Sequence, residues 1–281
     1  MPELPEVESI VRAVRPALLG RRIVACRVPW ARTLGGMTPR RFAGRLRGCR
    51  ITAVTRRAKH FVIAVPGPGR PRQALVGHLR MSGRLVVAAG PAAEARWVRV
   101  ALDLDDGCVL QFVDVRKFGR LELVEDPAPR LADLGPEPLA PGFDADALGA
   151  CLAGRRRAIK AALLDPRVVA GIGNIYADEA LFAARLHPAR RADRLRRPER
   201  TRLHAALVDV LQRALARGGS SFDAFYRMPD GRPGSFQDEF AVYGRTGRPC
   251  RRCGATVRRF VVAGRGTHVC LRCQRPPRAS S

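Results

Sequence analysis

The sequence predicts an α+β multidomain protein: an N-terminal antiparallel β-sandwich with a flanking helix, a helical middle domain and a C-terminal zinc ribbon. Three observations support this. Apolar residues follow first a helical and then a strand-like period over residues 1–130, they return to a helical period over residues 131–246, and paired cysteines appear within residues 247–281. The 281 residues suffice for two or three domains with ample cores.

The N-terminal helix is expected to begin near Pro5, which suits a first helical turn, and to end before Gly20. Apolar side chains recur at helical spacing between these residues: Val7, Ile10, Val11, Val14 and Leu18. The acidic residues Glu6 and Glu8 favour the positive end of the helix. Such a helix would hold the start of the chain in a fixed place.

The next segment, from about residue 22 to 125, has the character of β-strands. Apolar residues alternate from Trp97 to Leu104, and Asp105-Asp106-Gly107 reads as a hairpin turn. The candidate strands are Ile23–Val28, Ile51–Val65, Ala74–Leu79, Leu85–Ala88, Trp97–Leu104 and Cys108–Val115. Together they indicate an antiparallel sandwich or barrel.

A proline-rich segment, Asp126–Pro141, reads as a linker, and helical spacing follows it. The candidate helices are Ala158–Leu164, Tyr176–Leu186 and Pro198–Arg217. Gly218 and Gly219 end the last of them and begin a long loop to Gly234 that contains Phe225 and Tyr226. Loops of this length are usually functional lids or disordered segments.

Four cysteines near the C-terminus have metal-ligand spacing. Cys250, Cys253, Cys270 and Cys273 form the pattern C-x2-C-x16-C-x2-C, which falls in the range of zinc ribbons. The alternative is two disulfides, which a reducing cytosol disfavours. We expect one structural Zn²⁺ per chain, because four thiolates leave no coordination position open for catalysis.

The composition indicates a polyanionic partner. The formal net charge is +26, and cations placed at phosphates release condensed counterions. The alternative is a solvated basic surface in a chain from a GC-rich genome, because only Lys59, Lys117 and Lys160 among 51 basic residues are lysine. That bias also suggests that each remaining lysine needs a compact charge or a deprotonatable amine.

No stretch of the sequence approaches the ~20 apolar residues of a membrane span, and the N-terminus lacks the basic head and apolar core of a signal peptide. We therefore expect a cytoplasmic protein without a membrane partner.

The chain starts Met1-Pro2-Glu3, and removal of the methionine would expose a secondary amine at Pro2. An α-amino group titrates near pH ~8, so more of it is neutral and nucleophilic at pH 7 than of a lysine amine. A secondary amine that attacks a sugar C1′ gives an iminium ion, and the neighbouring Glu3 could move protons. The alternative is an ordinary Met-Pro start with acidic residues at a helix end.

Four motifs occur in order and carry a resemblance. They are Pro2–Glu8 (PELPEVE), Arg56–Lys59 (RRAK), Gly171–Ala177 (GIGNIYA) and the four-cysteine ribbon. From Pro2 to Cys273 the chain closely resembles the formamidopyrimidine-DNA glycosylases. The resemblance implies a monomer that acts on damaged double-stranded DNA. It would excise oxidised purines such as 8-oxoguanine and formamidopyrimidines, cleave the strand by β,δ-elimination, and contain a helix-two-turn-helix in its middle domain.

The resemblance also implies roles for three catalytic residues. Pro2 would displace the damaged base and form the Schiff base, and Glu3 would protonate the opening sugar and assist elimination. Lys59 would contact a phosphate near the lesion and serve in δ-elimination. Glu6 matches a further N-terminal functional residue with a supporting role.

Other residues match the family's DNA contacts. Met81 and Phe118 would wedge into the duplex where the base has left, and Arg116 would bond the orphaned cytosine. Asn174 in the helix-two-turn-helix, Lys160 on the preceding helix and Arg265 in the ribbon hairpin would bind backbone phosphates. By composition alone, Met81 and Phe118 would more often be core residues.

The sequence departs from the family in two places that matter here. Arg80 replaces a frequent glycine, and Glu94–Arg99, with Trp97 in place of a frequent histidine, replaces a His-rich stretch, so that Arg96 or Arg99 would have to supply its phosphate contact. Two alternatives stay open: an endonuclease VIII-type enzyme for oxidised pyrimidines, and a noncatalytic zinc-containing DNA-binding protein. Leu4 and the Arg116–Phe118 pair favour the purine enzyme over the first.

Overall fold

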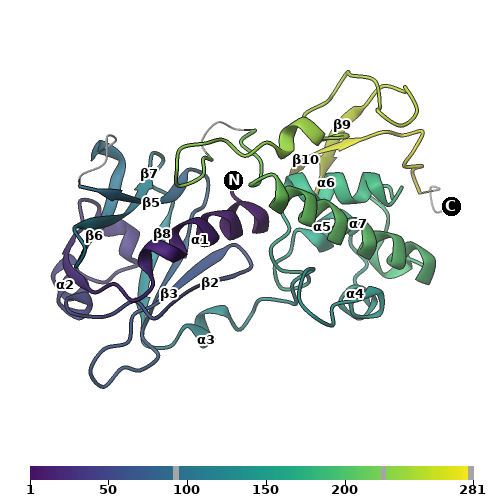
Figure 1. The fold of residues 1–281 in the computed structure, drawn as a ribbon. Helices are drawn as coiled ribbons and strands as arrows, with labels where there is room; N and C mark the ends of the chain where they lie inside the picture. The colour runs from purple at the N-terminus through teal and green to yellow at the C-terminus, as the bar shows by residue number, and fades with distance from the viewer. Residues whose placement is uncertain (91–94, 223–225, 278–281) are drawn as a thin grey trace. The chain divides into compact units, whose positions relative to one another are not determined.

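The computed structural model describes residues 1–90, 95–222 and 226–277, so Phe225 and Glu94 of the sequence analysis lie outside the described residues. The chain divides into two compact units (Figure 1). Unit 1 comprises Met1–Ala132 with Arg217–Ser235, and unit 2 comprises Asp133–Ala216 with the chain from Phe236 onward. The division into three domains with limits at residues 130 and 246 stays a prediction.

Unit 1 contains two four-stranded antiparallel sheets, in the orders β1-β6-β7-β5 and β2-β3-β4-β8. The strands are β1 (Ile23–Arg27), β2 (Ala53–Arg57), β3 (His60–Ala64), β4 (Ala74–His78), β5 (Gly83–Ala89), β6 (Val98–Leu104), β7 (Cys108–Asp114) and β8 (Arg120–Val124). Side chains from both sheets, including Ile63, Leu75, Leu85 and Phe112, share one buried core. The predicted sandwich is therefore confirmed, and the barrel alternative is not.

The structure differs from the predicted strands chiefly at Ile51–Val65, which is a hairpin rather than one strand. Ala58 has φ 54°, a left-handed conformation, and it turns β2 into β3 with Lys59 in the turn. No glycine, proline or asparagine marks this turn, and the basic residues Arg56, Arg57 and Lys59 around it do not by themselves predict one. Strand β8 and helix α2 (Pro39–Leu46) were not among the predicted elements.

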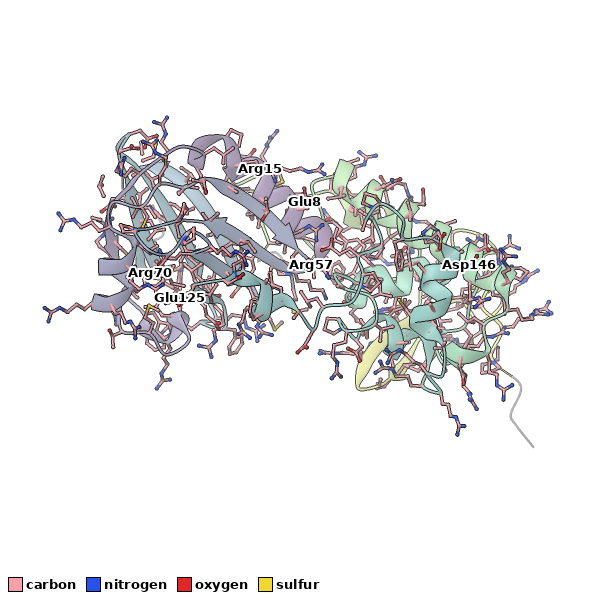
Figure 2. All side chains as sticks on the ribbon, turned by 90° about the horizontal axis from the view of Figure 1, so that it is seen from below. Glu8, Arg15, Arg57, Arg70, Glu125 and Asp146 are labelled. Atoms are coloured by element: carbon pink, nitrogen blue, oxygen red, sulfur yellow. The ribbon has the colours of Figure 1, made fainter. Side chains whose placement is uncertain are left out.

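The N-terminal helix α1 (Leu4–Leu18) packs its apolar stripe on the sandwich, as the sequence predicts. A hydrogen bond and an ion pair, each made by an arginine, fix the position of the helix. The Nε of Arg15, on α1, donates to the carbonyl oxygen of Val54 at 2.8 Å, and Glu8, on α1, pairs with Arg56 of β2. Figure 2 labels Glu8 and Arg15 on α1 and Arg57 at the end of β2. Short elements complete this part of the chain: η1 (Ala31–Leu34), η2 (Ala95–Trp97) and α3 (Pro127–Leu131).

Up to residue 277, where the described part of the chain ends, unit 2 consists of helices and one β-hairpin. Its elements are α4 (Ala145–Leu152), α5 (Ile159–Leu163), α6 (Asn174–Ala183), η3 (Ala192–Arg194), α7 (Arg197–Ala216), η4 (Phe236–Glu239), β9 (Arg258–Val262) and β10 (Arg265–Val269). Helix α7 packs against α4 and α6, and α6 also packs against β10. The predicted helical part and ribbon hairpin are confirmed. Within the described residues, no helix is both long and apolar enough to cross a membrane.

Candidate catalytic and DNA-binding site

The N-terminal candidates Glu3 and Glu6 form a capping box at the start of α1. Glu3 is the residue before the first turn, and Glu6 Oε2 accepts a hydrogen bond from the Glu3 N–H at 2.8 Å. Both carboxylates are 2% exposed, and Pro2 beside them is buried. The helix start therefore holds two acidic side chains in fixed positions next to Pro2, whose nitrogen becomes the terminal amine when Met1 is removed.

Glu6 also anchors the start of the long loop that follows α7. Its Oε1 accepts from the Ser220 N–H at 2.8 Å, and a Cβ on Gly219 would come within 2.8 Å of the same oxygen. The buried Tyr226 hydroxyl donates to the Gly218 carbonyl at 2.8 Å, and burial together with the charge of Glu6 raises the pKa of Tyr226. The described ends of this loop are thus fixed to α1 and the sandwich core.

Lys59 lies in the β2–β3 turn, and an ion pair connects that turn to α1. Arg56 donates from Nε to Glu8 Oε2 at 2.8 Å and from Nη1 to the Ala58 carbonyl at 3.0 Å. Burial acts to raise the pKa of Glu8, but the hydrogen bonds from Arg12 and Arg56 more than offset it, so the pKa lies below its ordinary value. The same helix therefore positions both Glu3 and the turn that carries Lys59.

Two histidines lie next to this turn on paired strands. His60 of β3 is opposite His78 of β4, and their rings meet edge to face with centroids 4.7 Å apart. Burial is the main cause that lowers the pKa of His60 to about 4 and that of His78 to about 3. The Lys59 charge lowers the pKa of His78 further, so both rings are neutral at pH 7 beside the lysine.

The three predicted void-filling residues lie on two loops that the structure brings together. Met81, 36% exposed, sits between β4 and β5, whereas Arg116 and Phe118, the latter 52% exposed, sit between β7 and β8. The Arg116 guanidinium lies 5.1 Å from the centre of the Phe118 ring. Apolar side chains exposed in this way are not core residues, which removes the alternative that composition left open.

The departure at residues 94–99 leaves one candidate cation at the surface. Arg99 is 5% exposed, and its Nε donates to the carbonyl oxygen of Asp114 at 2.7 Å, so it is committed to the interior. Arg96 is exposed and stacks over Trp97 at 4.7 Å from the ring centre.

In unit 2, Asn174 and the ribbon hairpin meet. Asn174 begins α6 after Gly173, and its Nδ2 donates to the Gly266 carbonyl at 3.0 Å. Arg265, the residue before Gly266, is exposed at the start of β10. The two predicted phosphate contacts of this unit therefore lie on neighbouring elements.

The structure replaces the predicted phosphate contact of Lys160 with a structural role. Its side chain is 0% exposed, and Nζ lies 2.6 Å from Asp178 Oδ1. The same ammonium donates to the Gly266 carbonyl at 3.0 Å and to Thr267 Oγ1 at 2.9 Å. Lys160 thus holds the strand that carries Arg265, and an ion pair together with two hydrogen-bond acceptors around one nitrogen suits a compact ammonium rather than a planar guanidinium.

The four ribbon cysteines converge on one point. Their sulfur atoms all lie within 4.8 Å of one another, with Cys250–Cys273 at 3.9 Å and Cys253–Cys270 at 3.5 Å. Zn–S bonds of ~2.3 Å in a tetrahedron require sulfur separations of roughly 3.8 Å, so the donor set fits one structural zinc. Gln274, buried behind the site, accepts from the Cys270 N–H at 3.1 Å.

Sequence reasoning missed the residues that connect these sites. Asp178 lies four residues after Asn174 on one face of α6, and its Oδ2 accepts from the His268 N–H at 2.8 Å. Asp114 ends β7 and connects the two void-filling loops. Their only signal in the sequence is an acidic residue within an apolar helix or at the end of an apolar strand.

Comparison with known proteins gives matches along almost the whole chain. Three family models match in order: the formamidopyrimidine-DNA glycosylase N-terminal domain over residues 1–121, its H2TH domain over 134–225, and a zinc finger found in FPG and IleRS over 247–276. A formamidopyrimidine-DNA glycosylase of Symbiobacterium thermophilum is 46% identical over 281 residues, which cover 99% of this chain and 90% of the relative.

Solved structures agree with this match. The MutM (Fpg) protein of Thermus thermophilus is 44% identical with a TM-score of 0.84, over 97% of this chain and 98% of that one. A Lactococcus lactis Fpg in complex with DNA that contains an abasic site is 33% identical with a TM-score of 0.88, over 98% and 100% of the two chains. The chain belongs to the formamidopyrimidine-DNA glycosylase family.

Proposed function

We propose that this chain excises oxidised purines from duplex DNA and then cleaves the strand at the abasic site. The observation that carries the proposal is the start of α1, where a capping box fixes the buried Glu3 and Glu6 directly after the buried Pro2. A capping box is structural in itself, but a buried carboxylate that adjoins Pro2 also places a proton donor next to the proposed nucleophile, which a noncatalytic DNA-binding protein does not need.

The first chemical step belongs to Pro2. After removal of Met1, the secondary amine attacks C1′ of the damaged nucleotide, the C1′–N bond to the base breaks, and the base leaves with a proton. Glu3 protonates the sugar ring oxygen as the ring opens, which leaves an iminium between Pro2 and C1′. The iminium draws electrons from the neighbouring C–H bond, so that the 3′ phosphate and then the 5′ phosphate are eliminated.

Lys59 acts on the phosphate beside the lesion. Its turn is held to α1 through Arg56 and Glu8, which fixes the backbone of Lys59 relative to the start of α1. The neutral His78 next to it adds no competing positive charge at pH 7. In this arrangement Lys59 donates a proton to the departing phosphate oxygen in the second elimination.

The remaining candidates bind the duplex. Arg116 bonds the orphaned base while Met81 and Phe118 occupy the void, and Asn174 and Arg265 bind backbone phosphates. Zinc, when bound, supplies structure only, because the four cysteines complete its coordination. Basic side chains project from the surfaces of both units (Figure 2), and cations at a surface favour binding to DNA phosphates. We place this binding at the nucleoid DNA of the cytoplasm.

The second candidate function is excision of oxidised pyrimidines. One solved Lactococcus lactis Fpg relative, 34% identical to this chain, is a complex with DNA that contains an oxidised pyrimidine. Binding of such DNA therefore does not distinguish the two substrate classes, and the rate of excision has to.

The test is borohydride trapping and single-turnover excision on duplexes that carry 8-oxoguanine, a formamidopyrimidine or an oxidised pyrimidine. We expect a covalent adduct with each purine lesion and faster excision of purines than of the pyrimidine. No adduct with any duplex would overturn the proposal, and faster pyrimidine excision would favour the second candidate.

A further inference from the structure

A buried carboxylate lies between the two loops that carry the void-filling residues. Asp114, the last residue of β7, is 1% exposed. Its Oδ1 accepts from the Ser82 hydroxyl at 2.5 Å and from the Arg116 N–H at 3.2 Å, and its Oδ2 accepts from the Gly119 N–H at 2.7 Å. Hydrogen bonds to a charged acceptor are stronger than neutral ones, and a charge buried without them would be costly.

Ser82 completes the connection from the Met81 side. It is 3% exposed, and its oxygen accepts from the Arg116 N–H at 3.0 Å while its own proton goes to Asp114. The Met81 loop is itself tight, because the Gly83 N–H donates to the Leu79 carbonyl at 2.9 Å. Ser82 and Asp114 therefore connect the residue after Met81 directly to the backbone of Arg116.

Both loops contain a residue in a strained conformation. Arg80, just before Met81, has φ 53°, and Lys117, between Arg116 and Phe118, has φ 61°. Residues other than glycine adopt this left-handed backbone conformation at a cost in free energy, and the surrounding structure has to hold them in it. The hydrogen bonds of Asp114 are in the right place to do so, since they bind the backbone on both sides of Lys117.

We propose that Asp114, with Ser82, is a positioning residue that makes the two loops act as one wedge. Met81 from one loop and Arg116 with Phe118 from the other then occupy the void together rather than independently. This inference rests on the proposed function, because it assigns those three side chains to the space left by the extruded base. It predicts that Asp114 matters only where an opposite strand provides a void to fill.

The test compares two substrates with the variants Asp114→Asn and Ser82→Ala. The first substrate is a set of four duplexes, in which 8-oxoguanine lies opposite each of the four bases in turn. The second is single-stranded DNA with an abasic site, which has no opposite base. For Asp114→Asn we expect single-turnover excision from the duplex opposite cytosine to fall about tenfold, as loss of charge-assisted hydrogen bonds implies. Preference for cytosine should fall as well, and borohydride trapping on the single strand should stay within about twofold.

Asp106→Asn is the matched control. Asp106 lies before the other end of β7, where its Oδ1 accepts from the Cys108 N–H at 3.0 Å in a turn without any void-filling residue. Both activities of this variant should equal those of the wild type. Ser82→Ala removes a single hydroxyl and should show the pattern of Asp114→Asn at smaller size, and it decides the question if Asp114→Asn does not fold.

The outcomes separate this inference from the proposed function. A wild-type protein that neither excises nor traps would refute the function itself. With an active wild type, variants that retain duplex excision and cytosine preference would overturn the role of Asp114. An equal loss on duplex and single strand would overturn it too, because it would reveal general damage to the catalytic centre.

Discussion

Lys59 and Lys160 belong to one small class in the sequence but lie in opposite environments. Lys59 is half-buried in a hairpin turn of unit 1, next to the helix that carries Glu3. Lys160 is fully buried in unit 2, where it binds Asp178, Gly266 and Thr267. A lysine preserved in an arginine-rich chain therefore indicates the need for a compact ammonium, but not whether that need is chemical or structural.

The burial of each lysine decides which need applies. An ammonium that donates to a departing oxygen has to reach the substrate, whereas the Lys160 ammonium is fully buried between an ion-pair partner and two hydrogen-bond acceptors and cannot reach one. Substitution of Lys59 should therefore lower the rate of reaction, whereas substitution of Lys160 should lower the free energy of unfolding.

Lys59→Met should abolish most of the δ-elimination. Loss of a positioned proton donor costs about 10²- to 10⁴-fold in rate, while a surface turn substitution changes the free energy of unfolding by no more than about 0.5 kcal/mol. Rapid-quench assays that separate the β- and δ-elimination products give the rate, and thermal unfolding gives the stability. Full δ-elimination by the variant would remove Lys59 from the chemistry.

Lys160→Met should destabilise unit 2 instead. It leaves the Asp178 carboxylate buried without its cation, which costs about 3–5 kcal/mol. Lys160→Arg should also destabilise, by about 1–3 kcal/mol, since a larger group must enter a filled site. Urea unfolding measures both, and Lys160→Met with Asp178→Asn should recover part of the loss. An unchanged unfolding midpoint for Lys160→Met would contradict the structural role.

The histidine pair beside Lys59 should make stability depend on pH. In the unfolded chain imidazole titrates near pH 6.5, whereas in the folded chain burial lowers the pKa of His60 to about 4 and of His78 to about 3. Between these values the folded state binds fewer protons, so stability is complete above pH ~6.5 and is lost as the pH falls toward 4. On these pKa values the loss by pH 4 should be on the order of 3 kcal/mol for each histidine.

Urea midpoints from pH 7 to pH 4 measure this dependence. His60→Phe keeps an aromatic ring against His78 and removes one titrating group, so its curve should be flatter than that of the wild type. Identical slopes for the two proteins would assign the pH dependence to other groups.

The substitutions Arg116→Ala and Arg265→Ala should change different properties of DNA binding. Arg265→Ala removes a phosphate contact, so it should weaken all duplexes alike and make the slope of log affinity against log salt shallower by about one unit. Arg116→Ala should reduce discrimination in favour of cytosine by about 1–3 kcal/mol. Binding of a lesion analogue opposite each base, at two salt concentrations, measures both. A uniform loss for Arg116→Ala would make it another phosphate contact.

Patterns with a regular period or spacing were the predictable part of this molecule. The α1 stripe, the β6–β7 hairpin and the four cysteines all follow local rules, and each is confirmed. The β2–β3 turn was not predictable, because Ala58 and Lys59 form it without a residue that favours turns. The environment of Lys160 was not predictable either, because its partners Gly266 and Thr267 lie more than 100 residues away.

One departure from the family pattern gains a physical reason from the structure. The resemblance leads us to expect glycine at the position of Arg80, and the φ of 53° there is a conformation that glycine adopts without strain. The sequence revealed the unusual residue, and only the backbone revealed why glycine would be preferred there.

The most direct test of the account is the identity of the amine that forms the covalent adduct. The chain has only three lysines, so after removal of Met1 just four amines compete: Pro2, Lys59, Lys117 and Lys160. Borohydride trapping on 8-oxoguanine duplex, followed by proteolysis and mass spectrometry, should place the sugar remnant on the peptide that begins with Pro2. A remnant on the Lys59 peptide, with Pro2 unmodified, would contradict the assignment of Pro2 as nucleophile.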